Sequence, residues 1–273
     1  MRCNQKVKYI FIVFFSIILA ITLHAMASNY STTPKVANWS FFVEFLGLSL
    51  TLILWYSIAF GSIAFIFYRF EDRLPGVGSI KGLRYGISIG ILWLWGMIEG
   101  VSLSGNLLIN EFLTGICDAI PILLMGLLLG NFTTKENNIE NTVSSNRRFL
   151  SIFIFSTVFL VGRYLCYFTN IIKSGYQSSP YFTFIWTLLM GACIGVTYLL
   201  LGKVTKSSST FLSATKFGII IFGVNWTVFI IFIPFIFKGT LIGSIIRIVS
   251  DILLVILSYY ISEFLDKLIV KKD

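Results

Sequence analysis

The sequence predicts an all-α, polytopic integral membrane protein with about eight transmembrane helices, arranged as two parallel four-helix repeats. Composition is the first reason: of 273 residues, 56% are hydrophobic and 12% are charged, whereas soluble domains carry roughly 25% charged residues. The second is that apolar runs of helix length recur along the whole chain, without the weak alternation of a membrane β-barrel. The third is a correspondence between the two halves. The short connecting segments leave no room for a soluble catalytic or nucleotide-binding domain.

A bilayer-spanning helix needs about 20 predominantly apolar residues. The stretches that meet this requirement are 9–28, 41–68, 82–100, 108–131, 149–170, 181–202, 215–237 and 241–265. The first stretch follows Lys6 and Lys8 and ends at Ala25, Met26 and Ala27, a pattern that also imitates a cleavable signal peptide. The sequence leaves its cleavage open. The second stretch is long enough to tilt in the bilayer.

The positions of the basic residues predict the orientation of these helices. Sixteen of the twenty-one Lys and Arg residues lie in or beside the segments on one side of the membrane, and Lys35, Lys173 and Lys238 lie on the other. Cytoplasmic segments carry the excess of Lys and Arg. The sequence therefore predicts a protein of the cell membrane with both termini in the cytoplasm. We interpret the basic segments as topology signals that also contact the lipid bilayer, and we expect no nucleic-acid partner.

Glycine pairs four residues apart recur in the predicted helices and indicate close helix packing. The pairs are Gly86 with Gly90, Gly96 with Gly100, Gly126 with Gly130, Gly191 with Gly195, and Gly239 with Gly243.

The fourth predicted helix carries polar residues that do not belong in lipid. Glu111, Thr114 and Asp118 are spaced i, i+3 and i+7, so they share one helix face. Asp118 lies about 10 Å deeper than Glu111, at 1.5 Å per residue, and so near the middle of the membrane. Pro121 cannot donate a hydrogen bond to the carbonyl of Cys117, which frees that oxygen beside Asp118. An ionisable group at this depth indicates a protein-buried or water-filled site.

The polar segment 132–148 is the predicted cytoplasmic linker between a first four-helix unit, 1–131, and a second, 149–273. Sliding one half over the other supports this division. The matches are Phe15-Ser16 with Phe155-Ser156, Gly61 and Tyr68 with Gly191 and Tyr198, Gly90 and Trp93 with Gly223 and Trp226, and Leu108, Ile109 and Asp118 with Leu241, Ile242 and Asp251. Because four is even, the two units share one orientation, which implies a pseudo-two-fold axis along the membrane normal.

Two arginines are predicted within helices, and each has a candidate acid. Arg247 precedes Asp251 by one helical turn and can pair with it. Asp118 has no cation on its own helix, so Arg163 is its expected partner. The predicted substrate- or ion-binding residues are Asp118, Glu111, Thr114, Arg163, Arg247 and Asp251. A structural interpretation stays open, in which both pairs only hold helices in register while Glu99 and Glu111 lie in the outer headgroup region.

The sequence contains none of the usual nucleotide-binding, metalloprotease or paired-cysteine motifs. His24 is the only histidine, which excludes a histidine-rich metal site. We therefore expect no enzyme activity, no catalytic residue, no cofactor and no metal ligand. Two aspartates on related helices also fit an aspartyl dyad. Intramembrane aspartyl proteases use a GxGD motif, whereas this chain has Gly115 and Cys117 before Asp118, so that enzyme is a remote alternative.

The favoured hypothesis is a small transporter or permease, coupled to protons or cations, with a small cationic solute or a proton as its ligand. It rests on an excess of acids over arginines in the outer half of the membrane and on a proline beside an intramembrane acid. The alternative is a non-catalytic membrane subunit, sensor or immunity-type interaction protein, whose protein partner the sequence does not identify.

Overall fold

The fold is described from a computed structural model, which covers residues 3–28, 38–134 and 145–270. Throughout these residues the secondary structure is helical, and no strand is formed in them. The helices are α1 (Cys3–Met26), α2 (Phe41–Leu46), α3 (Leu48–Phe70), η2 (Glu71–Arg73), α4 (Ser79–Ile98), α5 (Gly100–Ser104), α6 (Leu108–Thr133), α7 (Ser145–Phe168), α8 (Pro180–Leu201), η3 (Gly202–Thr205), α9 (Thr210–Lys216), the π-helix η4 (Phe217–Gly223), α10 (Val224–Ile230), α11 (Phe232–Ile236) and α12 (Leu241–Val270).

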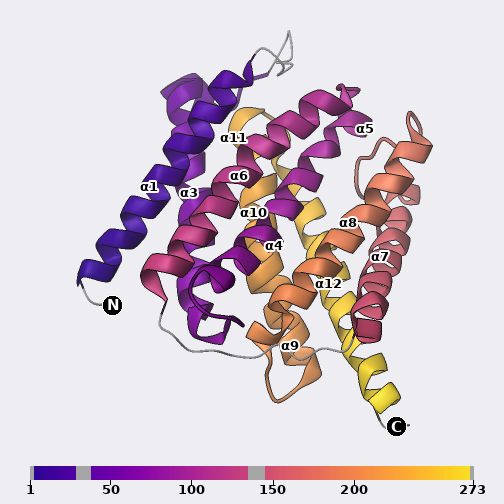
Figure 1. Ribbon diagram of the computed structural model, residues 1–273. Coiled ribbons are helices and arrows are strands. Elements are labelled where there is room, and N and C mark those ends of the chain that lie inside the picture. Colours follow the sequence, from indigo (N-terminus) through magenta and orange to yellow (C-terminus); the bar gives the residue numbers. More distant parts are fainter. Residues whose placement is uncertain (1–2, 29–37, 135–144, 271–273) are drawn as a thin grey trace.

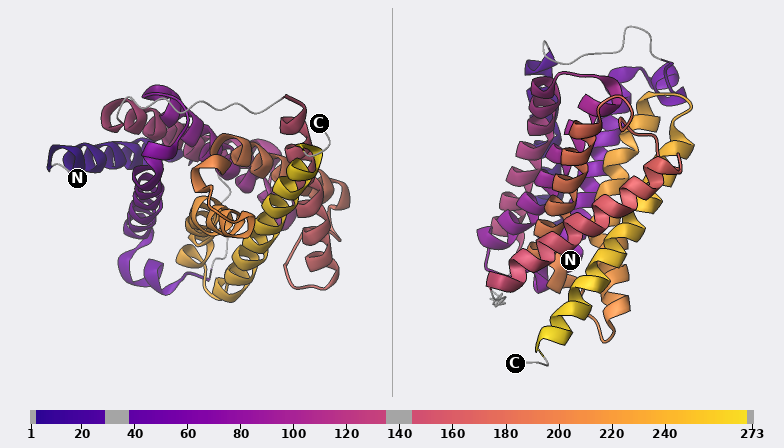
Figure 2. Two further views of the ribbon diagram at one scale, coloured as in Figure 1. Left: turned by 90° about the horizontal axis from the view of Figure 1, so that it is seen from below. Right: turned by 90° about the vertical axis from the view of Figure 1, so that its right-hand side faces the viewer.

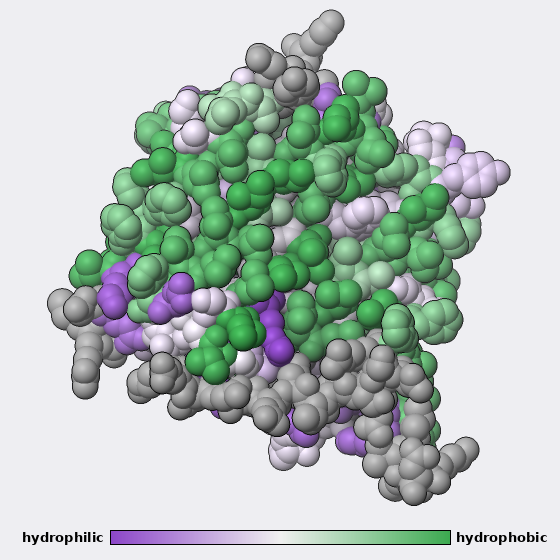
Figure 3. Space-filling model, viewed as in Figure 1, coloured by the Kyte–Doolittle hydropathy of each residue, from purple (hydrophilic) through white to green (hydrophobic). Residues whose placement is uncertain are grey.

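The described residues contain eight helical spans that are long and apolar enough to cross a membrane. This confirms the prediction of an all-helical fold with eight helices of membrane-spanning length and composition, and it supports a multi-pass membrane protein. The start of α1 and the end of α12 lie at the same end of the bundle (Figure 1), as an even number of spans requires. Apolar side chains cover most of the face seen in Figure 3, and hydrophilic ones gather toward its lower end. Most of the predicted linker, residues 135–144, lies outside the described residues.

Two of the predicted helices are interrupted. The single helix predicted at 41–68 is wrong, because Gly47 adopts a φ of +77° and separates α2 from α3. Such a positive φ is readily available to glycine and ends regular helix geometry. The seventh span, Thr210–Ile236, also changes geometry along its length, from α9 through the π-helix to α10 and α11. Lengths and hydropathy predicted both spans but not these breaks.

The two halves of the chain repeat one pattern of helix neighbours. In the first half α1 packs against α3 and α6, and α4 packs against α6; in the second, α7 packs against α8 and α12, and the segment from α9 to α11 packs against α12. Between the halves, α4 packs on α8 while α10 and α11 pack on α3. Figures 1 and 2 show α4 between α6 and α8 in the middle of the bundle. The contact of α4 with α8 and that of α10 and α11 with α3 correspond to each other if the two halves are equivalent. The duplication itself stays a prediction.

The most extensive helix contact joins α4 and α6, and glycines make it possible. A Cβ atom added at Gly82 would lie 2.0 Å from the carbonyl oxygen of Gly126, and one at Gly86 would lie 3.0 Å from the Leu123 backbone. Gly191 meets the backbone of α7 in the same way, at 2.6 Å from Ser156 Cα. Close packing at these glycines follows the pattern of small residues at membrane helix interfaces.

The prediction fails for the last glycine pair. Gly239 has a φ of +80° and begins no helix contact, and a Cβ at either Gly239 or Gly243 would meet nothing within 4 Å. Gly239 therefore lies in a turn, and Gly243 lies at an open helix position. The spacing of four residues alone does not distinguish this pair from one at a helix contact.

Gly82→Ala is expected to destabilise the bundle, because the new methyl group overlaps backbone that cannot rotate away. Overpacking of a well-packed core typically costs about 1 to 3 kcal/mol, and here α4 and α6 must separate. Gly243→Ala is the matched control, since the same methyl group enters open space. Thermal unfolding of both variants in detergent checks the prediction; equal melting temperatures would show that the two helices do not pack this closely.

Candidate functional site

Arg163 on α7 has a side chain that is 0% exposed, as has Asp251 on α12. Its guanidinium binds Asp251 of α12 with two parallel hydrogen bonds, Nε to Oδ1 and Nη2 to Oδ2, both 2.6 Å. Such bidentate, charge-assisted pairs are the strongest ionic contacts between side chains. Trp226 of α10 donates a further hydrogen bond of 2.7 Å from Nε1 to Oδ2 of Asp251. Both oxygens of the carboxylate therefore have a hydrogen-bond partner.

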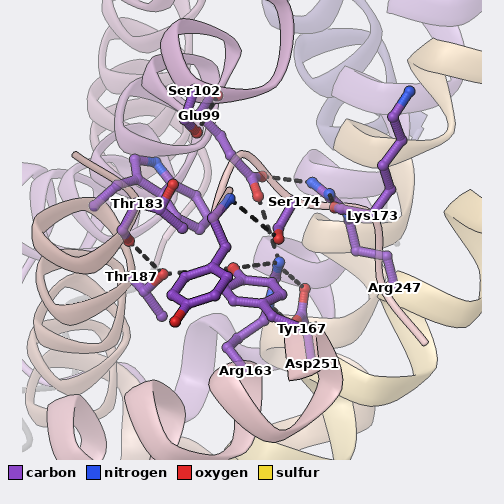
Figure 4. Close-up of polar contacts among 12 residues, drawn as sticks. Glu99, Ser102, Arg163, Tyr167, Lys173, Ser174, Thr183, Thr187, Arg247 and Asp251 are labelled. Carbon is purple, nitrogen blue, oxygen red and sulfur yellow. Dashed lines mark hydrogen bonds and ion pairs between the residues drawn. The ribbon is translucent and has the colours of Figure 1, made fainter. Parts of the chain in front are cut away.

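Glu99, which follows α4, links this pair to a second arginine. Its Oε1 accepts from Arg163 Nη1 at 3.4 Å, and its Oε2 accepts from Arg247 Nη1 at 2.5 Å. Arg247 also donates from Nη2 to the backbone carbonyl of Lys173, in the loop between α7 and α8, at 2.8 Å. Figure 4 shows these side chains converging from α4, α7 and α12. We call Glu99, Arg163, Arg247 and Asp251 the four-charge network.

Aromatic side chains surround Arg163. Its guanidinium lies 5.4 Å from the ring centroid of Phe159 and 5.5 Å from that of Trp186, and its Nη1 donates to the hydroxyl of Tyr167 at 3.3 Å. A desolvated arginine over aromatic faces gains cation–π energy in addition to its ion pair.

Two positive and two negative side chains balance within the four-charge network, so it carries no net charge when all four are ionised.

Both predicted ion pairs are wrong in their partners. Arg247 binds Glu99 instead of Asp251, because both oxygens of Asp251 are taken by Arg163 and Trp226. Arg163 does not reach Asp118, because α7 packs against α8 and α12 whereas α6 packs against α1 and α4. Glu99 is buried and bound to both arginines, while its predicted depth at the level of the headgroups stays a prediction.

Asp118 forms a separate site in the first half of the chain. Its side chain is 5% exposed, and its Oδ1 lies 3.0 Å from Nε2 of His24 on α1 and 3.1 Å from the hydroxyl of Tyr56 on α3. The His24 side chain is 30% exposed. We call His24, Tyr56 and Asp118 the Asp118 site. Among the described residues, Asp118 therefore has a neutral donor and a titratable base as its partners, but no permanently charged one.

Among the described residues, no hydrogen bond or ion pair joins the other two predicted site residues to either group. Glu111 is buried near the start of α6, beside Gly100, and its Oε1 accepts a hydrogen bond from the side-chain amide of Asn106. Thr114 donates to the carbonyl of Asn110 on its own helix at 2.8 Å. The shared helix face of Glu111, Thr114 and Asp118 therefore does not gather them around one ligand.

Pro121 does not break the helix that carries Asp118. The helix α6 continues from Leu108 to Thr133 with Pro121 inside it, so the proline removes one backbone donor and no more. The irregular backbone lies instead in the seventh span, where the π-helix ends at Gly223 and Asn225 donates to the carbonyl of Ile221 at 2.5 Å. Trp226, which lies in α10 just after the π-helix, donates a hydrogen bond to Asp251.

Sequence reasoning missed His24, Tyr56, Glu99 and Trp226 as partners. Depth in the membrane was a usable signal for Glu99. Glu99 and Arg247 both lie near those ends of their helices that are predicted to face outward, so they lie at a similar level. Spacing within one helix does not show this. His24 is the only basic residue in the last two turns of the first span, which was also a usable signal. For Tyr56 and Trp226 the chain offers no signal, because buried aromatic residues occur throughout these helices.

The two sites support different chemistry. The four-charge network is closed and balanced, whereas the Asp118 site can gain or lose a proton. The two aspartates share no hydrogen-bond partner among the described residues, so no contact joins them as a dyad sharing one proton requires. In the part of the chain that the structure describes, no group of three or more His, Cys, Asp or Glu side chains is arranged to hold a metal ion.

Comparison of the chain with protein-family models, with curated proteins and with solved structures finds no match. The function is therefore argued from the two sites.

Proposed function

We propose that this protein is a small transporter or permease whose substrate movement is coupled to a proton or another cation at Asp118. One observation carries the proposal: Asp118 is a buried carboxylate in the middle of a membrane helix, and no permanently charged side chain of residues 3–28, 38–134 or 145–270 forms an ion pair with it. Intramembrane acids are costly to bury, so one without a fixed partner is a functional candidate.

The rest of the bundle supports this assignment by contrast. Asp251, at the corresponding depth of α12, is held by an arginine and a tryptophan. The four-charge network therefore suits a scaffold that joins α4, α7 and α12, while the Asp118 site suits a change of charge. In this proposal Arg163, Arg247 and Asp251 support the site, and the substrate is a small cationic solute or a proton.

The distribution of basic residues supports a cell-membrane location with both termini in the cytoplasm. It also supports contact of the inner ends of the helices with anionic lipid. The proposal includes no enzymatic step and no cofactor.

A non-catalytic membrane subunit or immunity-type interaction protein is the second candidate. The ion pairs of the four-charge network favour it. Three of the predicted site residues, Arg163, Arg247 and Asp251, are bound to other side chains of the same network. A protein that only holds a partner in the membrane needs such rigid pairs and no exchangeable ion.

Reconstitution into liposomes tests the proposal. The purified protein is placed in vesicles containing a pH-sensitive dye, a proton gradient is imposed, and Na⁺, K⁺ and a panel of small organic cations are added in turn. We expect at least one of them to change the internal pH faster than in protein-free vesicles. Folded protein that moves none of them, together with stoichiometric co-purification of a membrane partner, would favour the second candidate.

A further inference from the structure

Two aspartates in this chain are held in matching ways. Asp118 on α6 and Asp251 on α12 each lie about ten residues from the helix end at Leu108 or Leu241. Each carboxylate has one partner from the first long helix of its half of the chain and one aromatic donor. For Asp251 the first partner is Arg163. For Asp118 it is His24.

These bases occupy nearly equivalent positions. The offset of 140 that relates Phe15 to Phe155 places His24 on Tyr164, one residue from Arg163. The aromatic donors are the hydroxyl of Tyr56 and the indole Nε1 of Trp226. The main chemical difference is that the guanidinium of arginine keeps its charge at every accessible pH, whereas imidazole gains and loses a proton in the physiological range.

The side chains of Arg163 and His24 also differ in exposure. Arg163 is 0% exposed, while His24 is 30% exposed at the side chain. The imidazole therefore reaches the surface of the bundle. Asp118, behind it, stays buried.

The contacts of Asp118 favour a proton over a metal cation as the exchanged ion. Hard cations such as Na⁺ and Ca²⁺ need several oxygen ligands around them. The partners at Asp118 Oδ1 are instead an imidazole nitrogen and a phenolic hydroxyl, and both of these groups can donate a proton. No further carboxylate of the described residues joins them.

We propose that His24, Asp118 and Tyr56 form a proton-binding site, in which protonation of His24 makes the ion pair with Asp118 and deprotonation releases it. The second half keeps the permanently charged form of the same pair, Arg163 with Asp251. This inference names the coupling ion of the proposed function. It rests on that function for its role in transport but not for the binding of the proton.

Within the part of the chain that the structure describes, few other charged groups surround the pair. On α6 itself the neighbour is Cys117, and Glu111 lies about two turns away. On α4, Gly90 faces Ala119, so Asp118 lies level with an apolar part of that helix. The remaining titratable or charged groups of the packed helices lie toward their other ends or in the four-charge network: Lys6, Lys8 and Tyr9 on α1, Tyr68 and Arg69 on α3 with Glu71, Asp72 and Arg73 after it, and Lys81, Arg84, Tyr85 and Glu99 on or after α4.

The composition of the chain makes a direct test possible. His24 is the only histidine, so protein labelled with ¹⁵N-histidine gives one imidazole whose titration is followed by NMR in detergent micelles or nanodiscs. An opposite charge within hydrogen-bonding distance shifts a titration midpoint by about 1 to 3 pH units. We therefore expect Asp118→Asn to move the midpoint of His24 by about one unit or more.

Glu111→Gln is the matched control, because it removes another buried acid from the same helix without touching His24, and it should leave the midpoint near the wild-type value. Tyr56→Phe is the second variant, used if Asp118→Asn does not fold, and it should give a smaller shift. An unchanged His24 midpoint in the variant tested, or equal shifts in that variant and in Glu111→Gln, would overturn the proposal.

The test separates this inference from the proposed function. A His24 midpoint that depends on Asp118, in a protein that moves no solute, would support the proton site and contradict transport. Solute-coupled flux with a His24 midpoint that ignores Asp118 would do the reverse. His24→Arg adds a functional readout: it converts the pair to the form seen at Arg163 and Asp251, and we expect folded protein whose flux no longer depends on the pH gradient.

Discussion

Arg163→Met is expected to remove most of the folded protein. The change leaves Asp251 buried with only the Trp226 hydrogen bond, and it takes from Glu99 one of its two arginines. Breaking a buried ion pair by removing one partner typically costs about 3 to 5 kcal/mol, a large share of the stability of a typical domain. Folded yield after solubilisation and the melting temperature in detergent measure the effect.

The double variant Arg163→Met with Asp251→Leu is the control for this prediction. It removes both charges of the central pair and keeps the contact of Glu99 with Arg247. Replacing a whole buried pair by apolar residues is often neutral or stabilising, so the double variant should recover much of the yield. A single variant as stable as wild type would show that the pair contributes nothing to holding α7 against α12.

Asp118→Asn is expected to have the opposite profile, with a fold close to wild type and no coupled flux. Asparagine can still accept from Tyr56, and His24 can remain neutral, so no buried charge loses its partner. The expected destabilisation is about 1 kcal/mol, the usual net value of a hydrogen bond. The ionisable group is lost entirely, so the step that needs a change of charge stops.

Asp251→Asn is the matched comparison, because it makes the same chemical change at the corresponding depth of α12. Arg163 cannot give up its charge, so this variant should lose folded protein as Arg163→Met does. If both asparagine variants unfold equally, Asp118 is a structural residue and the distinction between the two sites fails.

Much of the fold was predictable from the sequence, because one physical requirement dominates it. A helix that crosses lipid must be predominantly apolar over about 20 residues, so hydropathy located the eight spans of the described residues. The break at Gly47 and the π-helix at Phe217–Gly223 were not predictable in this way. The first depends on the backbone conformation of a single glycine, and the second lies in a segment that packs against α12. The total hydrophobicity of a segment does not depend on either feature.

Some charged residues of the two sites were predictable from the sequence, but their partners were not. The rarity of charge in these helices identified Asp118, Arg163, Arg247 and Asp251 directly. Partner choice depends on which helices are neighbours, and the sequence does not give that order. The helix order places α7 against α12, so Arg163 meets Asp251, while α1 brings His24 to Asp118.

The measurement that tests this account most directly is coupled flux per folded molecule in proteoliposomes, for wild type and Asp118→Asn side by side. Both proteins are quantified by size-exclusion chromatography after reconstitution, so that differences in folding do not enter the comparison. The account predicts that the variant loses at least about tenfold in flux, equivalent to 1.4 kcal/mol or more, at nearly wild-type melting temperature. A folded Asp118→Asn variant with wild-type, gradient-dependent flux would contradict it.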